Sequence, residues 1–384
     1  MRKTLEASFL FAGTIIGAGV LALPSVIAQT GAVYGTAIMI IVGVIVLLVA
    51  LMFGEVVLKT KENHQLPGLA EKYVGKKAMK LAILFSVLAM YGALVAYIHG
   101  CGLVLAQMFG LPFQTAKLLF FMPMILITYF GIKGVEESET LMTTIMLASL
   151  IAITIGAFFF FDASNLAIND ATKILLPIGI LVFAFEGLPA IPQMSEVLGE
   201  EKKNLRKSII IGFSIPLTLY ISFSVACIGA LGTDIAEVAT LSLTKYGSIF
   251  STVGNIFALF AMATGFISLS NAIYETYSED MKINGKLSWV LACFIPLIVL
   301  SIANVLLPKL NFTEIVSYTG ILFTGPYYLI TIYTFYKARN GGDRVPEYKL
   351  GIPNYLTGLV MILFFAFSVW AVWSVVQTII FASP

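Results

Sequence analysis

The sequence predicts an all-α integral membrane protein, and three features support this class. Of its 384 residues, 59% are hydrophobic and only 11% are charged, whereas a soluble domain carries roughly 25% charged residues. The mean hydropathy is +0.95. The apolar residues form stretches near the roughly 20 residues that cross a bilayer as a helix, and these lack the alternating polarity of a membrane barrel. The composition therefore excludes a water-soluble globular protein.

Eleven stretches have crossing length, and the loops between them are short, so residues 1–384 are expected to form a single transmembrane domain. The stretch after Arg2 and Lys3 is longer than the core of a signal peptide, about 7 to 15 residues, and is therefore expected to be a membrane helix. The stretches cover residues 6–29, 34–57, 79–109, 113–131, 139–161, 173–195, 207–231, 247–277, 287–307, 314–335 and 354–381.

The distribution of lysine and arginine predicts the orientation. With the N-terminus in the cytoplasm, nineteen of the 23 basic residues fall in inner loops, and the outer side keeps Lys117, Lys173, Lys245 and Lys309. Positive charge normally stays on the cytoplasmic side. We therefore expect a multi-pass protein of the plasma membrane with a cytoplasmic N-terminus and an outer C-terminus.

The spacing of the stretches indicates that five helices are used twice. The second set follows the first at about 170 to 175 residues, with repeat one over about 6–161 and repeat two over about 173–335. Because five is odd, the second copy enters the membrane from the opposite side. This is an inverted repeat of the kind found in secondary transporters, with an extra helix at 354–381.

Two predicted helices are interrupted at matching positions of the repeats. The first reads GTIIGAGVLALP from Gly13 to Pro24, and the sixth reads FAFEGLPAIP from Phe183 to Pro192. Such paired interruptions point to a transporter's binding site, because unwound backbone persists in a membrane only where it lines a cavity or meets a ligand. A helix N-terminus suits a carboxylate, and free carbonyls suit an ammonium group. The alternative for each break is close helix packing through Gly-x-x-x-G or a simple proline kink.

Glu186 is the only carboxylate expected near the middle of the membrane. Inserting an ionised side chain there costs about 2.5 to 3.5 kcal/mol. We hypothesise that Glu186 carries a proton and that its charge state depends on substrate occupancy. The alternative is a permanently protonated Glu186 that holds the unwound backbone in place.

The remaining polar residues of the apolar stretches suggest structural roles. His99, in the third stretch, is expected to be a hydrogen-bonded structural residue, with a part in transport as the alternative. Cys101, Cys227 and Cys293 are too far apart in sequence to suggest a disulfide framework or a metal cluster.

The two interrupted stretches resemble helices 1 and 6 of the amino acid/auxin permease group and of the related bacterial aromatic amino acid permeases. Both groups belong to the amino acid-polyamine-organocation superfamily, and the resemblance implies its five-plus-five LeuT-type fold with broken helices 1 and 6. Phe-Ala-Phe-Glu-Gly is similar to the proton-coupled branch. The resemblance implies that the substrate carboxylate faces Thr14, Gly17, Ala18 and Gly19, and that its amine and side chain face Phe183, Ala184, Phe185 and Gly187.

In sodium-coupled relatives of this fold, hydroxyls of helix 8 and carbonyls of helix 1 hold the ion. The resemblance would place a sodium site at Gly13, Ile16, Thr264 and Ser268. Oxygen ligands suit such a hard cation, although hydroxyls within helices also bond to their own backbone. Residues 139–161 contain no lysine, which excludes the variant in which a lysine of helix 5 replaces the ion.

We expect a secondary active transporter that imports or exchanges neutral amino acids, with aromatic ones among the candidates, coupled to protons. A sodium-coupled symporter and a non-transporting amino acid sensor are the alternatives. A channel would need rings of charge or filter carbonyls, and the motifs His-Glu-x-x-His and Gly-x-Ser-x-Gly of enzymes are absent. No cofactor is expected. The expected partners are an amino acid, a proton or a sodium ion, and the lipid bilayer, while the net charge of +2 without a basic cluster argues against nucleic acid.

Overall fold

The computed structural model of the chain describes residues 2–62, 64–130, 135–167 and 169–381. These residues are almost wholly helical, and their one strand-like contact is an isolated antiparallel bridge between Gly31 and Asn169. Residues 131–134, with Lys133 of the predicted inner set, lie outside the described residues. The predicted all-α class is confirmed for the part of the chain that the structure describes.

Each predicted stretch of the first repeat coincides with a helix or with a broken pair of helices. The short helix α4 was not predicted, because its eight residues are amphipathic and cannot cross a bilayer. The helices are α1 (Arg2–Ile15), α2 (Gly19–Thr30), α3 (Ala32–Lys59), α4 (Leu66–Tyr73), α5 (Lys76–Phe109), α6 (Phe113–Phe130) and α7 (Val135–Phe158).

The stretches assigned by prediction to a second repeat and an extra helix also coincide with helices. One stretch is again broken, and the predicted helix over 314–335 is continuous through a π-helical turn at Gly320–Thr324. The helices are α8 (Ile178–Ala184), α9 (Ala190–Leu198), α10 (Leu205–Leu231), α11 (Ala239–Ser242), α12 (Ser248–Glu275), α13 (Gly285–Leu306), α14 (Phe312–Thr319), α15 (Gly325–Ala338) and α16 (Asn354–Phe381).

Seven helices in the described chain are long and apolar enough to cross a membrane, and an eighth span arises if α1 and α2, bent by 64°, are counted as one. Two shorter apolar helices cover Thr144–Phe158 and Asn354–Trp370. The chain is therefore a multi-pass helical membrane protein by length and composition.

Glycines and one capping box set several helix ends. Gly110 ends α5 with φ 63° and Gly232 ends α10 with φ 66°, and glycine adopts such positive φ values without steric cost. At the start of α14, Asn311 accepts a hydrogen bond from the backbone N–H of Glu314, whose side chain bonds back to the Asn311 N–H. This capping box satisfies two N–H groups at the start of α14.

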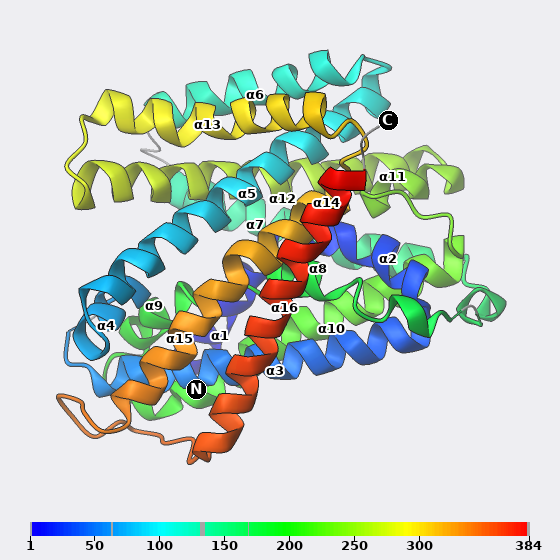
Figure 1. Cartoon of the computed structure of the whole chain (residues 1–384). Coiled ribbons are helices and arrows are strands. Elements are labelled where there is room, and N and C mark those ends of the chain that lie inside the picture. The colour runs from blue at the N-terminus through cyan, green and yellow to red at the C-terminus, as the bar shows by residue number, and fades with distance from the viewer. Residues whose placement is uncertain (1, 63, 131–134, 168, 382–384) are drawn as a thin grey trace.

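The two broken pairs lie together in the bundle. α1 packs against α9 and α10, α2 packs against α8 and α3, and α5 packs against α12 (Figure 1). α8 approaches the turn after α14 so closely that a Cβ on Gly320 would lie 2.0 Å from the carbonyl oxygen of Gly179. Only glycine allows this approach, which fixes α8 against the π-helical turn at Gly320–Thr324.

The segment between α15 and α16 is tied to the C-terminal end of α3. Tyr348 donates to the carbonyl of Leu51 at 2.6 Å, and the carboxylate of Glu55 accepts from the N–H of Leu350 at 2.8 Å. Asp343 pairs with Lys72 of α4, and this hydrogen bond holds the pKa of Asp343 below its usual range. These contacts join α3, α4 and the segment after α15 at the end of the bundle that carries Lys59, Lys61 and Lys72, the lysine-rich end.

Candidate functional site

The break between α1 and α2 covers residues 16–18. The backbone N–H of Ile16 still reaches Ala12, at 2.9 Å, but the N–H groups of Ala18 and Gly19 meet no acceptor in the described part of the chain. Ala18 has no side chain that could cap α2. The N-terminus of α2 is therefore an uncapped group of donors with a positive dipole end, the local chemistry that attracts a carboxylate.

The break between α8 and α9 covers residues 185–189. Glu186 folds back so that its Oε1 accepts the backbone N–H of Leu188 at 3.3 Å. The carbonyl of Pro189 accepts from the side chain of Gln65, next to α4, at 3.1 Å. The unwound segment thus reaches from the middle of the bundle toward the lysine-rich end.

Tyr220 of α10 holds both breaks together, and sequence reasoning missed it. Its hydroxyl oxygen lies 2.8 Å from the carbonyl of Ile15 and 3.2 Å from the carbonyl of Ala184. These carbonyls belong to the last residues of α1 and α8, whose helical partners are lost at the breaks. Tyr220 is fully buried, so its one hydrogen is shared between two helix ends that would otherwise face an apolar interior.

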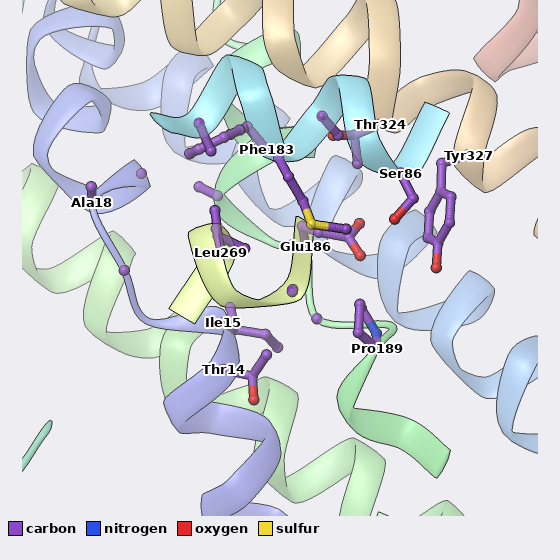
Figure 2. A pocket seen from close by; sticks show the side chains of 18 of the residues that line it. Thr14, Ile15, Ala18, Ser86, Phe183, Glu186, Pro189, Leu269, Thr324 and Tyr327 are labelled. Carbon is purple, nitrogen blue, oxygen red and sulfur yellow. The ribbon is translucent and has the colours of Figure 1, made fainter. Parts of the chain in front are cut away.

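A cavity of about 270 Å³ lies between the two breaks. Figure 2 shows Glu186 in the midst of the side chains that line this cavity, which come from α1, α5, α12, α15 and the breaks. The lining residues in the two breaks and in the helix ends beside them are Thr14, Ile15, Gly17, Ala18, Gly19, Phe183, Ala184, Glu186, Gly187 and Pro189. The other helices contribute Ser86, Ala89, Met90, Ala93, Tyr97, Leu269, Ala272, Thr324 and Tyr327.

Seven of the eight predicted substrate residues line this cavity, and the eighth, Phe185, does not. The ring of Phe185 is 1% exposed and lies 5.1 Å from the ring of Phe213 and 5.4 Å from that of Tyr220. It points into the bundle behind the break because residues two apart on a helix face different sides. Phe183 faces the cavity instead.

Glycines let the two breaks approach each other. A Cβ on Gly19 would lie 2.8 Å from Cα of Ala184, and one on Gly187 would lie 2.6 Å from the side chain of Ile15. Gly17 differs, because a Cβ there would meet nothing within 4 Å. Gly19 and Gly187 therefore permit close packing, whereas Gly17 borders open space in the cavity.

Glu186 is the only carboxylate that lines the cavity among the described residues. Tyr328 of α15 is close enough to interact with this carboxyl. However, neither the Tyr328 hydroxyl nor Oε2 of Glu186 has a hydrogen bond of standard geometry. One carboxyl oxygen, Oε1, accepts a hydrogen bond, whereas Oε2 has none. A proton on Oε2 or a donor group of a ligand could satisfy this second oxygen.

The four residues of the sodium alternative are not among the residues that line the cavity. They are Gly13, Ile16, Thr264 and Ser268. The hydroxyl of Thr264 bonds to the carbonyls of Phe260 and Ala261, at 2.8 and 3.2 Å, as hydroxyls within helices commonly do.

His99 does not line the cavity and belongs to a separate polar cluster. Its Nε2 lies 3.9 Å from Oε2 of Glu237, in the segment between α10 and α11, and its Nδ1 has no partner among the described residues. Glu237 also accepts the backbone N–H of Phe312 at the start of α14. Burial raises the pKa of Glu237. The contact ties α5 and α14 to the segment before α11, which sequence reasoning did not predict.

Two half-helix breaks around a cavity in a bundle of apolar helices define the chain as a membrane transporter. Comparison with known proteins gives the particular family. Residues 1–371 match the tryptophan/tyrosine permease family, and the chain belongs to it. The predicted kinship with aromatic amino acid permeases is confirmed, and the chain is an amino acid permease rather than an enzyme.

Curated relatives and solved structures agree with this assignment. Tyrosine-specific transport system 1 of Haemophilus influenzae is 26% identical, over 94% of this chain and 95% of the relative. Glutamine transporter 2 of Aliivibrio fischeri is 24% identical, over 83% and 85%. The crystal structure of a manganese transporter mutant, H236A, from Eremococcus coleocola superposes with a TM-score of 0.64 at 11% identity, over 98% of this chain and 88% of that one. At that identity the last match shows the fold alone.

Proposed function

We propose that the chain is a proton-coupled symporter that imports or exchanges neutral amino acids, aromatic ones above all. It works by alternating access around the cavity between α1, α2, α8 and α9. The carrying observation is Glu186, a carboxyl that lines the cavity at a helix break with one oxygen unsatisfied. The family, and relatives named for tyrosine and glutamine, support a neutral substrate.

The amino acid would lie with its carboxylate at the uncapped N-terminus of α2, against the N–H groups of Ala18 and Gly19. Its side chain would extend along α5, where Ala89 and Ala93 leave space beside Phe183. Ligand pockets usually measure about 300 to 1,000 Å³, so a cavity of about 270 Å³ suits one amino acid better than a peptide.

The membrane arrangement that goes with this function has eleven spans, a five-plus-five inverted LeuT-type repeat, a cytoplasmic N-terminus and an outer C-terminus in the plasma membrane. The cavity includes Ser86 near the start of α5 and Pro189 near the start of α9, while the outer half-helix residues Leu23 and Leu181 are completely buried. We therefore take this conformation to be the one that faces the cytoplasm, with the outer side closed.

Uptake into proteoliposomes tests the proposal. Labelled tyrosine, tryptophan and glutamine are offered under an inward proton gradient, an inward sodium gradient, or neither. We expect accumulation with the proton gradient, and we expect Glu186→Gln to exchange substrate without accumulating it, because an amide cannot release a proton. Gradient-driven accumulation by Glu186→Gln would refute the carrier role.

The sodium alternative predicts a different outcome of the same experiment. Accumulation would then follow the sodium gradient and would fall in Thr264→Ala and Ser268→Ala. Saturable binding without uptake under either gradient would instead identify a sensor.

A further inference from the structure

A second cavity, of about 570 Å³, lies on the outside of the bundle between the start of α5 and the helices α15 and α16. Figure 1 shows α15 and α16 side by side. The walls of this groove are apolar side chains from all three helices, and they include Leu81, Leu329, Ile330, Ile362 and Phe365. Leu81, Ile362 and Phe365 are exposed, so in a membrane the groove would be filled by lipid chains rather than by water.

The end of this groove carries positive charge. Lys77, in the first turn of α5, lines it directly. Lys337, in the last turn of α15, lies over the ring of Tyr333, with Nζ 5.4 Å from the ring centroid, and Tyr333 lines the groove. Both lysines stand at helix ends, where long side chains extend toward the lipid headgroups.

These lysines have no acidic partner within the described chain. The lysines that form ion pairs there are Lys59, Lys72 and Lys173, and no carboxylate lines the groove. The groove has apolar walls and two unpaired lysines at one end. A molecule with a hydrocarbon tail and an anionic head would complement both features.

We propose that this groove binds an acidic phospholipid, with an acyl chain along α15 and α16 and the headgroup phosphate between Lys77 and Lys337. Clusters of lysine beside membrane helices attract anionic headgroups, and the cation already stacked on Tyr333 is held at the headgroup level. A helix of a second copy could cover the apolar walls but would leave both lysines unpaired. This inference does not depend on the substrate or on the coupling ion.

Native mass spectrometry of the full-length protein in detergent tests the proposal. The protein is mixed with equal amounts of phosphatidylglycerol and phosphatidylcholine of identical acyl chains, and the ratio of the bound lipids is measured. Each lysine near a headgroup contributes roughly fivefold to binding. We therefore expect Lys77→Gln with Lys337→Gln to lower the phosphatidylglycerol preference by about 25-fold.

The control variant, Lys202→Gln with Lys203→Gln, removes two lysines from the short helical segment Gly199–Asn204, which does not line the groove. It should keep the full preference. Ala78→Phe, which fills the groove without changing charge, should reduce binding of both lipids.

Three results would overturn the proposal. They are an unchanged lipid ratio in the Lys77 and Lys337 double variant, an equal loss in the control variant, and displacement of the lipid by free glycerol phosphate at the lipid's own concentration. The last result would indicate an anion site without a lipid-chain site. If Ala78→Phe does not fold, the double lysine variant, which alters only exposed charges, still decides between these outcomes.

Discussion

Replacing Tyr220 with phenylalanine tests whether the two helix breaks are held as one unit. The substitution keeps the ring that packs against Phe185 and removes only the hydroxyl that Ile15 and Ala184 share. A hydrogen bond contributes about 0.5 to 1.5 kcal/mol net, and an unsatisfied buried carbonyl costs about 1 to 3 kcal/mol. Hydrogen bonds between helices of a membrane protein contribute about 0.6 kcal/mol each on average to its stability. We therefore expect Tyr220→Phe to lower the free energy of unfolding by about 1 to 2 kcal/mol.

Ile15 and Ala184 line the cavity, so the loss of the hydroxyl that they share should weaken substrate binding along with stability. A difference of 1 to 2 kcal/mol is a factor of roughly 5 to 30, and we expect KM for uptake to rise by about that factor. The matched control is Tyr246→Phe, whose hydroxyl also donates to a backbone carbonyl, that of Ala230, a residue that does not line the cavity. It should lower the melting temperature in detergent and leave KM unchanged. An unchanged KM in Tyr220→Phe would refute the reasoning.

Four further substitutions test packing at the breaks, access to the cavity and the contact made by Glu237. Gly19→Ala should abolish uptake, because its Cβ would lie 2.8 Å from the backbone of Ala184, whereas Gly17→Ala should fold normally and only narrow the cavity; equal uptake by the two variants would contradict this. Phe185→Leu should lower stability by about 1 kcal/mol without changing the order of substrate preference, since the ring is 1% exposed; a changed preference in a competition assay would place it in the site after all. Glu237→Ala should remove the contacts with His99 and Phe312 and speed thiol labelling of Cys101, which is buried two residues after His99; an unchanged labelling rate would show that these contacts do not close the bundle.

The helices and the two breaks were predictable because their signals are local. Stretch length, glycine and proline positions and loop charge are all read within about 30 residues. Phe185 was not placed correctly, because the side of the break that a ring faces depends on Phe213, which lies on another helix.

Tyr220 could not be singled out, because it is one of 16 tyrosines. No pattern in the sequence around it predicts that its hydroxyl contacts the ends of α1 and α8. The contact of His99 with Glu237 was missed for the same reason, since Glu237 lies 138 positions further along the chain. The contacts that hold the helices around the site are made by residues remote in sequence, whereas the helix breaks are encoded by local glycine and proline residues.

Protection of an introduced cysteine tests most directly whether the cavity between the breaks is the amino acid site. Ser86 lines the cavity and is half-buried, and the natural cysteines Cys101, Cys227 and Cys293 are buried, so Ser86→Cys should provide the main reactive thiol. We predict that a transported amino acid slows its labelling by a water-soluble thiol reagent, with half-protection near KM for uptake. A cysteine at the exposed Ser164 should show no protection. Labelling of Ser86→Cys that no transported amino acid slows would contradict the account.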